Sequence, residues 1–201
     1  STLFPYTTLF RSLALQGIYA CLIEIEDQSS AYEILEALEK ETPAFSRPNG
    51  IYIENSEKFD LIVEKGWWYI YNDQLSYAEE YLSELVASAP GNTNARTALA
   101  YVHYYRGWSR LALEDFQISV EMDPKDKAAQ VGLAYTLNEN DEWEKARNLT
   151  AELAKSYPAD LSVQKLQRSM ELQEKRTLTV DSNYSNSGNF SDGSGVTIRL
   201  D

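Results

Sequence analysis

Residues 93–126 read TNARTALAYVHYYRGWSRLALEDFQISVEMDPKD, two amphipathic segments joined by a short turn. Apolar and small side chains recur every three or four positions in each segment, which is the spacing of one face of an α-helix. Ala112, Phe116 and Val120 share such a face in the second segment. Asp123-Pro124 then ends that helix, because the residue before a proline avoids helical backbone angles. The stretch therefore predicts a pair of helices.

Three prolines place further copies of this unit before and after it. Pro90, Pro124 and Pro158 lie 34 residues apart, and small residues stand 12 and 24 positions before each of them. These small residues are Gly66, Ala78, Ala100, Ala112, Ala134 and Ala146. Small side chains allow close helix approach, and such units bury their apolar faces only by stacking on neighbours. The period and its columns resemble the tetratricopeptide repeat.

That resemblance implies an all-α fold, a solenoid of antiparallel helix pairs with a short β-prone tail. The repeat domain is predicted at 13–176, with repeats at about 12–45, 59–92, 93–126 and 127–160 and a polar-faced capping helix at 161–176. Residues 46–58 interrupt the period and are predicted to form an inserted loop. Residues 1–12 lack helical periodicity, so we expect a non-native leader there; an ordinary irregular leader is the alternative.

The apolar period changes from 3.6 to 2 after residue 176. Leu178 and Val180 alternate with polar residues, and so do Val196, Ile198 and Leu200, with a turn-rich segment between the two groups. Alternation of this kind is typical of outer-membrane barrel strands and equally of a half-buried hairpin. We predict that residues 177–201 are a linker and the first strands of a truncated barrel, and the hairpin remains the alternative.

Composition narrows the possible functions. The chain carries 31 acidic and 18 basic residues, a net charge of −13, so nucleic acid is not an expected partner. One cysteine and one histidine exclude a typical zinc site of Cys and His ligands. No phosphate-binding glycine loop and no nucleophile beside a base occur, so no cofactor, metal or catalytic residue is predicted, and the chain is not expected to be an enzyme.

Several polar residues have ordinary structural interpretations. His103 occupies a core or half-buried helix position, and Cys21, among apolar residues, is expected to be a small core side chain. The acidic pairs Glu79-Glu80 and Glu114-Asp115 on second helices are expected to be solvated.

Aromatic residues recur at equivalent positions of successive first helices, spaced i, i+4, i+7 and i+8. The predicted ligand-binding groove comprises Asp60, Trp67, Tyr71, Tyr101, Tyr104, Tyr105, Tyr135 and Glu139, with the two acids near its ends. Aromatic rings stack on sugar rings and on peptide side chains, and their faces attract cations. The alternative is that some of these rings simply fill the space between helices.

Three further stretches resemble a narrower family. ETPAF at 41–45 is followed by an insertion, then by residues 88–126 and by LNENDEWEKARNLTAELAKSYP at 137–158. Together with the Arg106-Gly107-Trp108 turn, they resemble the periplasmic domain of outer-membrane exporters of poly-β-1,6-N-acetylglucosamine. The resemblance implies a partly deacetylated polysaccharide ligand, a periplasmic deacetylase partner and attachment to the outer membrane through a barrel. A general protein-binding adaptor and an exporter of another polymer are the alternatives.

Overall fold

A computed structural model describes residues 14–15, 17–23, 25–46, 53–174, 178–185 and 193–200. The chain divides into two compact units, Ser1–Ala146 and Arg147–Asp201, which are described separately below.

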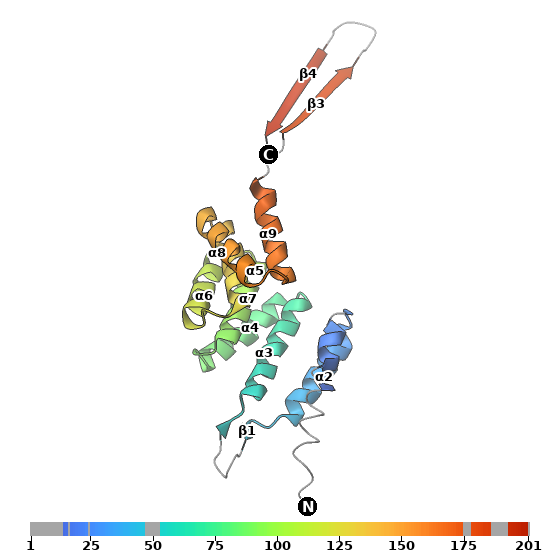
Figure 1. The fold of residues 1–201 in the computed structure, drawn as a ribbon. Coiled ribbons are helices and arrows are strands. Elements are labelled where there is room, and N and C mark those ends of the chain that lie inside the picture. The colour runs from blue at the N-terminus through green and yellow to red at the C-terminus, as the bar shows by residue number, and fades with distance from the viewer. Residues whose placement is uncertain are drawn as a thin grey trace, which may run out of the picture. The chain divides into compact units, whose positions relative to one another are not determined.

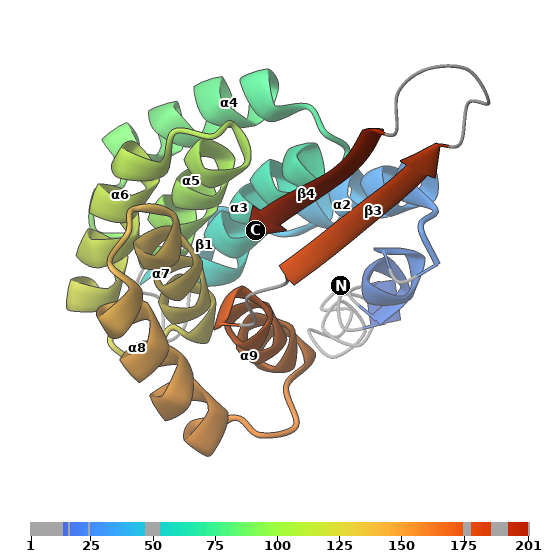
Figure 2. The same cartoon turned by 90° about the horizontal axis from the view of Figure 1, so that it is seen from above.

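The described part of the first unit is mainly helical (Figure 1). Residues 14–15 and 17–23 are helical, and they precede α2 (Gln28–Glu41), α3 (Ser56–Tyr71), α4 (Leu75–Ser88), α5 (Thr93–Tyr105), α6 (Ser109–Met122) and α7 (Lys127–Glu139). Helix α5 contacts both α3 and α7, and α4 and α6 lie on the outer side of these helices (Figure 2). The first helices of three successive pairs therefore form one face, called here the first-helix face.

Local chemistry sets the helix ends where the repeat predicts them. Helices α4, α6 and α8 (Trp143–Ser156) each end two residues before a repeat proline. Asn92 and Asp126 begin the next first helices, since their side chains accept hydrogen bonds from the Ala95 amide at 2.8 Å and the Ala128 amide at 2.9 Å. Such N-caps satisfy amides that have no partner within the helix. The ends of these helices thus share the 34-residue spacing of the three prolines.

Close packing follows the columns of small residues. Ala100, Ala112 and Phe116 form one fully buried cluster between α5 and α6. In the preceding pair a Cβ on Gly66 would lie 2.4 Å from Cδ2 of Leu82, so any side chain at this position would require Leu82 to move. The tetratricopeptide-type helix pair predicted from these columns is thus what the chain forms.

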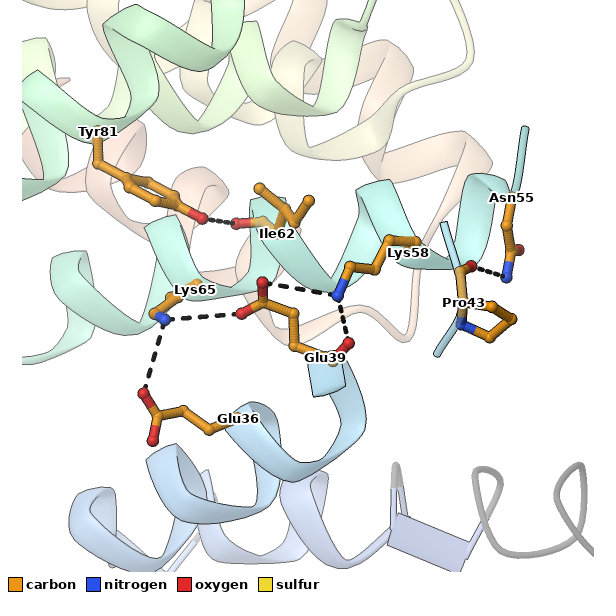
Figure 3. Close-up of polar contacts among 8 residues, drawn as sticks. All are labelled: Glu36, Glu39, Pro43, Asn55, Lys58, Ile62, Lys65 and Tyr81. Atoms are coloured by element: carbon orange, nitrogen blue, oxygen red, sulfur yellow. Dashed lines mark hydrogen bonds and ion pairs between the residues drawn. The ribbon is translucent and has the colours of Figure 1, made fainter. Parts of the chain in front are cut away.

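Helix α2 is held against α3 across the insertion by ion pairs (Figure 3). Lys65 Nζ lies 3.8 Å from Glu36 Oε1 and 3.6 Å from Glu39 Oε2, and Lys58 Nζ lies 3.6 Å from Glu39 Oε1. On the opposite side of α3, Tyr81 donates a hydrogen bond to the Ile62 carbonyl at 3.0 Å, and burial raises the pKa of Tyr81 to about 12.

The predicted loop at 46–58 is wrong at both ends. Strands β1 (Phe45–Ser46) and β2 (Ile53–Glu54) pair antiparallel, and α3 begins at Ser56, ahead of the predicted repeat start. The reason is local, since the Asn55 side chain caps the Glu57 amide at 3.2 Å and donates to the Pro43 carbonyl at 2.9 Å. Residues 47–52 lie outside the described part of the chain, as do residues 1–12.

Three expectations about single residues are also wrong. Cys21 is exposed and is not among the residues of the buried cluster that Leu15 and Tyr19 join. Asp115 is buried and paired, and Glu79 pairs with Arg106 of the following turn. Acidic pairs that look alike in the sequence thus lie in different environments.

The second unit contains most of α8, then α9 (Leu161–Glu174), which lies within the range predicted for a capping helix and buries Val163 and Leu166. Strands β3 (Leu178–Ser185) and β4 (Gly193–Leu200) pair antiparallel from Leu178↔Leu200 to Ser185↔Gly193. Both strands extend further into the turn-rich segment than the alternation predicts, because ladder hydrogen bonds come from the backbone and not from side-chain pattern.

Candidate functional site

The six aromatic residues predicted for the groove form one continuous row of ring contacts along the first-helix face. The row runs from Tyr71 to Trp67 with centroids 6.0 Å apart, from Trp67 to Tyr101 at 5.3 Å, from Tyr101 to Tyr105 at 6.0 Å, from Tyr105 to Tyr104 at 5.5 Å, and from Tyr104 to Tyr135 at 6.2 Å. Because the row crosses three helices, it exists only in the stacked repeats. We call it the aromatic row.

Members of the aromatic row differ in what they offer to a ligand. Tyr71 and Tyr105 are 55% and 56% exposed, so their rings are open to solvent. Tyr101 instead packs edge-on against Phe116, with the ring centroids 4.9 Å apart. Its hydroxyl donates a hydrogen bond to the Ala128 carbonyl at 2.9 Å. Burial raises the pKa of the Tyr101 phenol. Tyr101 therefore supports the row, while Tyr71 and Tyr105 provide its accessible surfaces.

The two predicted acids lie on different helices. Glu139, at the end of α7, hydrogen-bonds the Tyr104 hydroxyl; burial and then this carboxylate raise the Tyr104 pKa. Asp60 is exposed on α3 and lines a cavity of about 240 Å³ beside Trp67. The structure therefore brings both acids to the first-helix face that carries the aromatic row.

This cavity contains polar residues that the sequence interpretation missed. Its walls include Glu64 from α3, Thr97 from α5 and Asp126 before α7. The Thr97 hydroxyl donates to Asp126 Oδ2 at 2.9 Å, and burial raises the pKa of Glu64. The sequence signal was available, since Asp60 and Glu64 are spaced i, i+4 on one helix face.

Aromatic rings next to carboxylates suit a ligand that combines flat or ring-shaped surfaces with positive charge. Within the described residues, no group of three or more His, Cys, Asp or Glu side chains could hold a metal ion. None of the helices described is both long enough and apolar enough to cross a lipid bilayer.

These helix pairs form a tetratricopeptide-repeat fold, and solved structures show the same fold. The chain superposes with a TM-score of 0.52 on the Yersinia enterocolitica type III secretion translocator chaperone SycD, at 12% identity over 60% of this chain and 86% of that one. It superposes equally, at 0.52, on the Arabidopsis OM64 tetratricopeptide-repeat domain, at 14% identity over 58% and 97%. The first such domain of Spaghetti (RPAP3), bound to an HSP90 peptide, also gives 0.52, at 16% identity over 59% and 94%.

Among curated proteins, the chain is similar to the poly-β-1,6-N-acetyl-D-glucosamine export protein of Escherichia coli K12. The two are 24% identical over 174 residues, which is 83% of this chain and 21% of the relative. The corresponding protein of Escherichia coli O157:H7 matches to the same extent. The chain thus spans about a fifth of the length of these relatives. No family model matches it.

Proposed function

We propose that this repeat domain is a non-catalytic binding scaffold of a polysaccharide exporter in the envelope of a Gram-negative bacterium. It guides partly deacetylated poly-β-1,6-N-acetylglucosamine toward an outer-membrane barrel and docks a periplasmic deacetylase. Similarity to export proteins of that polymer supports the choice of polysaccharide. The aromatic row is the observation that carries the proposal, because its exposed rings can stack on successive sugars.

Charge selects the deacetylated form of the polymer. A free glucosamine amine is protonated near neutral pH, whereas an acetylated one is neutral. Asp60, Glu64 and Asp126 line the cavity beside Trp67, and Glu139 lies on α7 of the same face. Since partly exposed ion pairs contribute only about 0–1 kcal/mol each, affinity should be weak and distributed over many contacts. Weak, distributed binding lets a polymer move along the face.

The test is a calorimetric or NMR titration of the chain with short glucosamine oligomers of defined acetylation. Partly deacetylated oligomers should bind more tightly than fully acetylated ones. Replacing Tyr71 and Tyr105 together with alanine should weaken binding about tenfold, since each lost ring contact removes roughly 0.5–1.5 kcal/mol. Tyr101 is left intact, because its loss would disturb the packing between α5 and α7.

Tyr77→Ala is the matched control, since Tyr77 is 68% exposed on α4, outside the aromatic row. It should leave oligomer binding unchanged. Equal binding of acetylated and deacetylated oligomers, or no binding of either at millimolar concentration, would show that the polymer-guiding role is wrong for this domain.

A peptide-binding adaptor is the second candidate function. The RPAP3 domain of the same fold is bound to a peptide, and YrrB, at a TM-score of 0.51 and 20% identity, is described as having an unusual peptide-binding site. If the oligomer titration fails while extended peptides shift the resonances of Tyr71 and Tyr105, the adaptor function replaces the polysaccharide function.

A further inference from the structure

The first helix pair departs from the others at the position where they carry a small residue. Ala31 precedes Pro43 by 12 residues, as in every repeat, and 12 residues earlier stands Tyr19. The corresponding positions of the next two repeats hold Gly66 and Ala100. Tyr19 therefore carries a bulky phenol at the position where the following repeats have a small residue that allows two helices to approach closely.

In the second helix pair, α3 and α4, the position of the small residue is closely packed. At Gly66 even a Cβ would lie 2.4 Å from Leu82, four residues after Ala78. The equivalent residue of the first pair is Leu35, four residues after Ala31, and it is 1% exposed. Tyr19 cannot occupy the same place over Leu35, and its hydroxyl instead donates to Glu64 Oε2 of α3 at 3.5 Å.

A cavity of about 550 Å³ lies beside Tyr19, between helical residues 17–23, α2 and α3. Its floor is apolar and includes Leu35, Leu38 and Leu61, all buried. Ala20, an exposed residue with a short side chain, lines the same space. The cavity is large enough to admit a large apolar side chain together with neighbouring residues of a bound segment.

The α3 wall of this cavity is acidic. Glu57, Asp60 and Glu64 follow one face of the helix, and none of them forms an ion pair with a basic side chain among the described residues. The lysines of α3, Lys58 and Lys65, are directed to the acids of α2 instead (Figure 3). Burial also raises the pKa of Glu64, as expected for a carboxyl without a cationic partner.

We propose that this cavity docks a segment of a partner protein that carries a large apolar side chain next to Lys or Arg. The apolar side chain packs on the buried leucines, and the cation meets the carboxylates of α3. Charge complementarity selects this occupant, because an acidic segment would be repelled and a neutral one would leave the carboxylates unpaired. An amino-sugar polymer supplies positive charge but has no apolar side chain to fill the floor.

The probe is a fluorescein-labelled, acetylated and amidated peptide of alternating leucine and lysine, added to the full chain. Matched peptides carry glutamate in place of lysine, or serine in place of leucine. We expect the leucine–lysine peptide to bind saturably by anisotropy and to shift the methyl NMR signals of Leu35 and Leu38. The glutamate peptide should not bind, and the serine peptide should bind at least about tenfold more weakly, because it lacks the apolar anchor.

Two variants address residues that line only this cavity. Ala20→Trp places an indole ring at the cavity and should weaken binding of the leucine–lysine peptide about tenfold or more. Glu57→Gln should weaken it by up to about fivefold, as for one partly exposed ion pair. Glu80→Gln, an exposed acid on α4, is the control that removes the same charge without touching the cavity.

The result separates this site from the aromatic row. Neither Ala20→Trp nor Glu57→Gln should change glucosamine-oligomer binding, and Tyr71→Ala with Tyr105→Ala should not change peptide binding. The proposal is overturned if the serine peptide binds as tightly as the leucine one, or if Ala20→Trp folds and binds the leucine–lysine peptide normally. Should Ala20→Trp fail to fold, unshifted Leu35 and Leu38 methyls at peptide saturation overturn it.

Discussion

Asp115 joins two side chains of α5 in the interior of the central repeat. Its Oδ2 lies 2.9 Å from Nδ1 of His103, and its Oδ1 lies 3.1 Å from a guanidinium nitrogen of Arg96. Both partners are on α5 and Asp115 is on α6, so the carboxylate links the two helices of one pair. A buried carboxylate needs such partners, and a buried cation needs the carboxylate.

Replacing Asp115 with alanine should therefore destabilise the fold strongly. The loss would leave the Arg96 charge without its partner in a largely buried place, at a cost of roughly 2–4 kcal/mol. Glu114→Ala is the matched control, because the neighbouring Glu114 is exposed and should change the free energy of unfolding by no more than about 0.5 kcal/mol. Urea unfolding measures both; similar values for the two variants would contradict a stabilising role for the buried carboxylate.

The raised pKa of Glu64 should make the free energy of unfolding depend on pH, and the sign of the effect can be worked out. Burial raises its pKa in the folded chain above the value of 4.5 for an unperturbed glutamate. In the window between these values the folded state holds a proton that the unfolded state has lost, so stability falls as the pH rises through the window. Glu64→Gln removes this effect, because an amide does not titrate.

The Glu64→Gln chain should accordingly be more stable than the parent near pH 7 and equally stable near pH 3.5. Glu84→Gln removes one charge from an exposed position on α4 and serves as control, with little difference from the parent at either pH. Urea unfolding at the two pH values measures the effect. A loss of stability at neutral pH on replacing Glu64 would indicate a favourable charge interaction and would contradict the burial argument.

Two buried glycines differ in the side chain that an added Cβ would meet on the neighbouring helix. A Cβ on Gly132 of α7 would lie 2.3 Å from two ring carbons of Phe116 of α6. A Cβ on Gly66 would meet the flexible end of Leu82. A leucine tip can turn aside within a rotamer change, whereas an aromatic ring moves only as a whole.

Gly132→Ala should therefore destabilise the chain more than Gly66→Ala. We expect a loss of roughly 1–3 kcal/mol from overpacking at Gly132, reduced by up to about 1 kcal/mol because alanine favours the helix. Gly91→Ala is the control, since a Cβ there meets nothing within 4 Å. Thermal unfolding followed by circular dichroism ranks the three, and a higher melting temperature for Gly132→Ala would contradict the close contact of α6 with α7.

Element boundaries were predictable where a residue acts on the backbone itself. Pro90 and Pro124 fix helix ends by their ring geometry, so counting prolines located the repeats. The start of α3 was not predictable, because Asn55 caps it through contacts that exist only after Pro43 is brought nearby in the fold. Burial of Asp115 was missed for the same reason, since its partners lie on another helix.

For the molecule as a whole, the aromatic row and the acids Asp60 and Glu139 were predictable, whereas the cavity acids Glu64 and Asp126 were not. A 34-residue period places equivalent positions of successive repeats side by side, so the aromatic row follows from spacing alone. The cavity acids Glu64 and Asp126 lie in different repeats at non-equivalent positions, and only the stacked helices bring them to one cavity. The cavity beside Tyr19 was not predicted, because Tyr19 departs from the column of small residues and a search for repeated residues does not detect such a departure.

The net charge of −13 acts on the whole molecule, and salt should affect folding and ligand binding in opposite directions. An excess of like charge destabilises a compact chain by self-repulsion. Raising the ionic strength from about 0.01 M to about 0.15 M shortens the screening length from about 30 Å to about 8 Å. The melting temperature should therefore rise with salt, because long-range repulsion is screened more than the short ion pairs at Lys65.

Under the same change, partly deacetylated glucosamine oligomers should bind more weakly, because their attraction to the acidic face is screened as well. Some affinity should remain, since ring stacking at Tyr71 and Tyr105 does not depend on charge. Fully acetylated oligomers are neutral and provide the control, with affinity nearly independent of salt. Calorimetry at the two ionic strengths, with a melting curve at each, makes the comparison. If salt lowers the melting temperature, short ion pairs dominate the electrostatics of folding, and if both oligomers respond to salt alike, charge does not select the ligand.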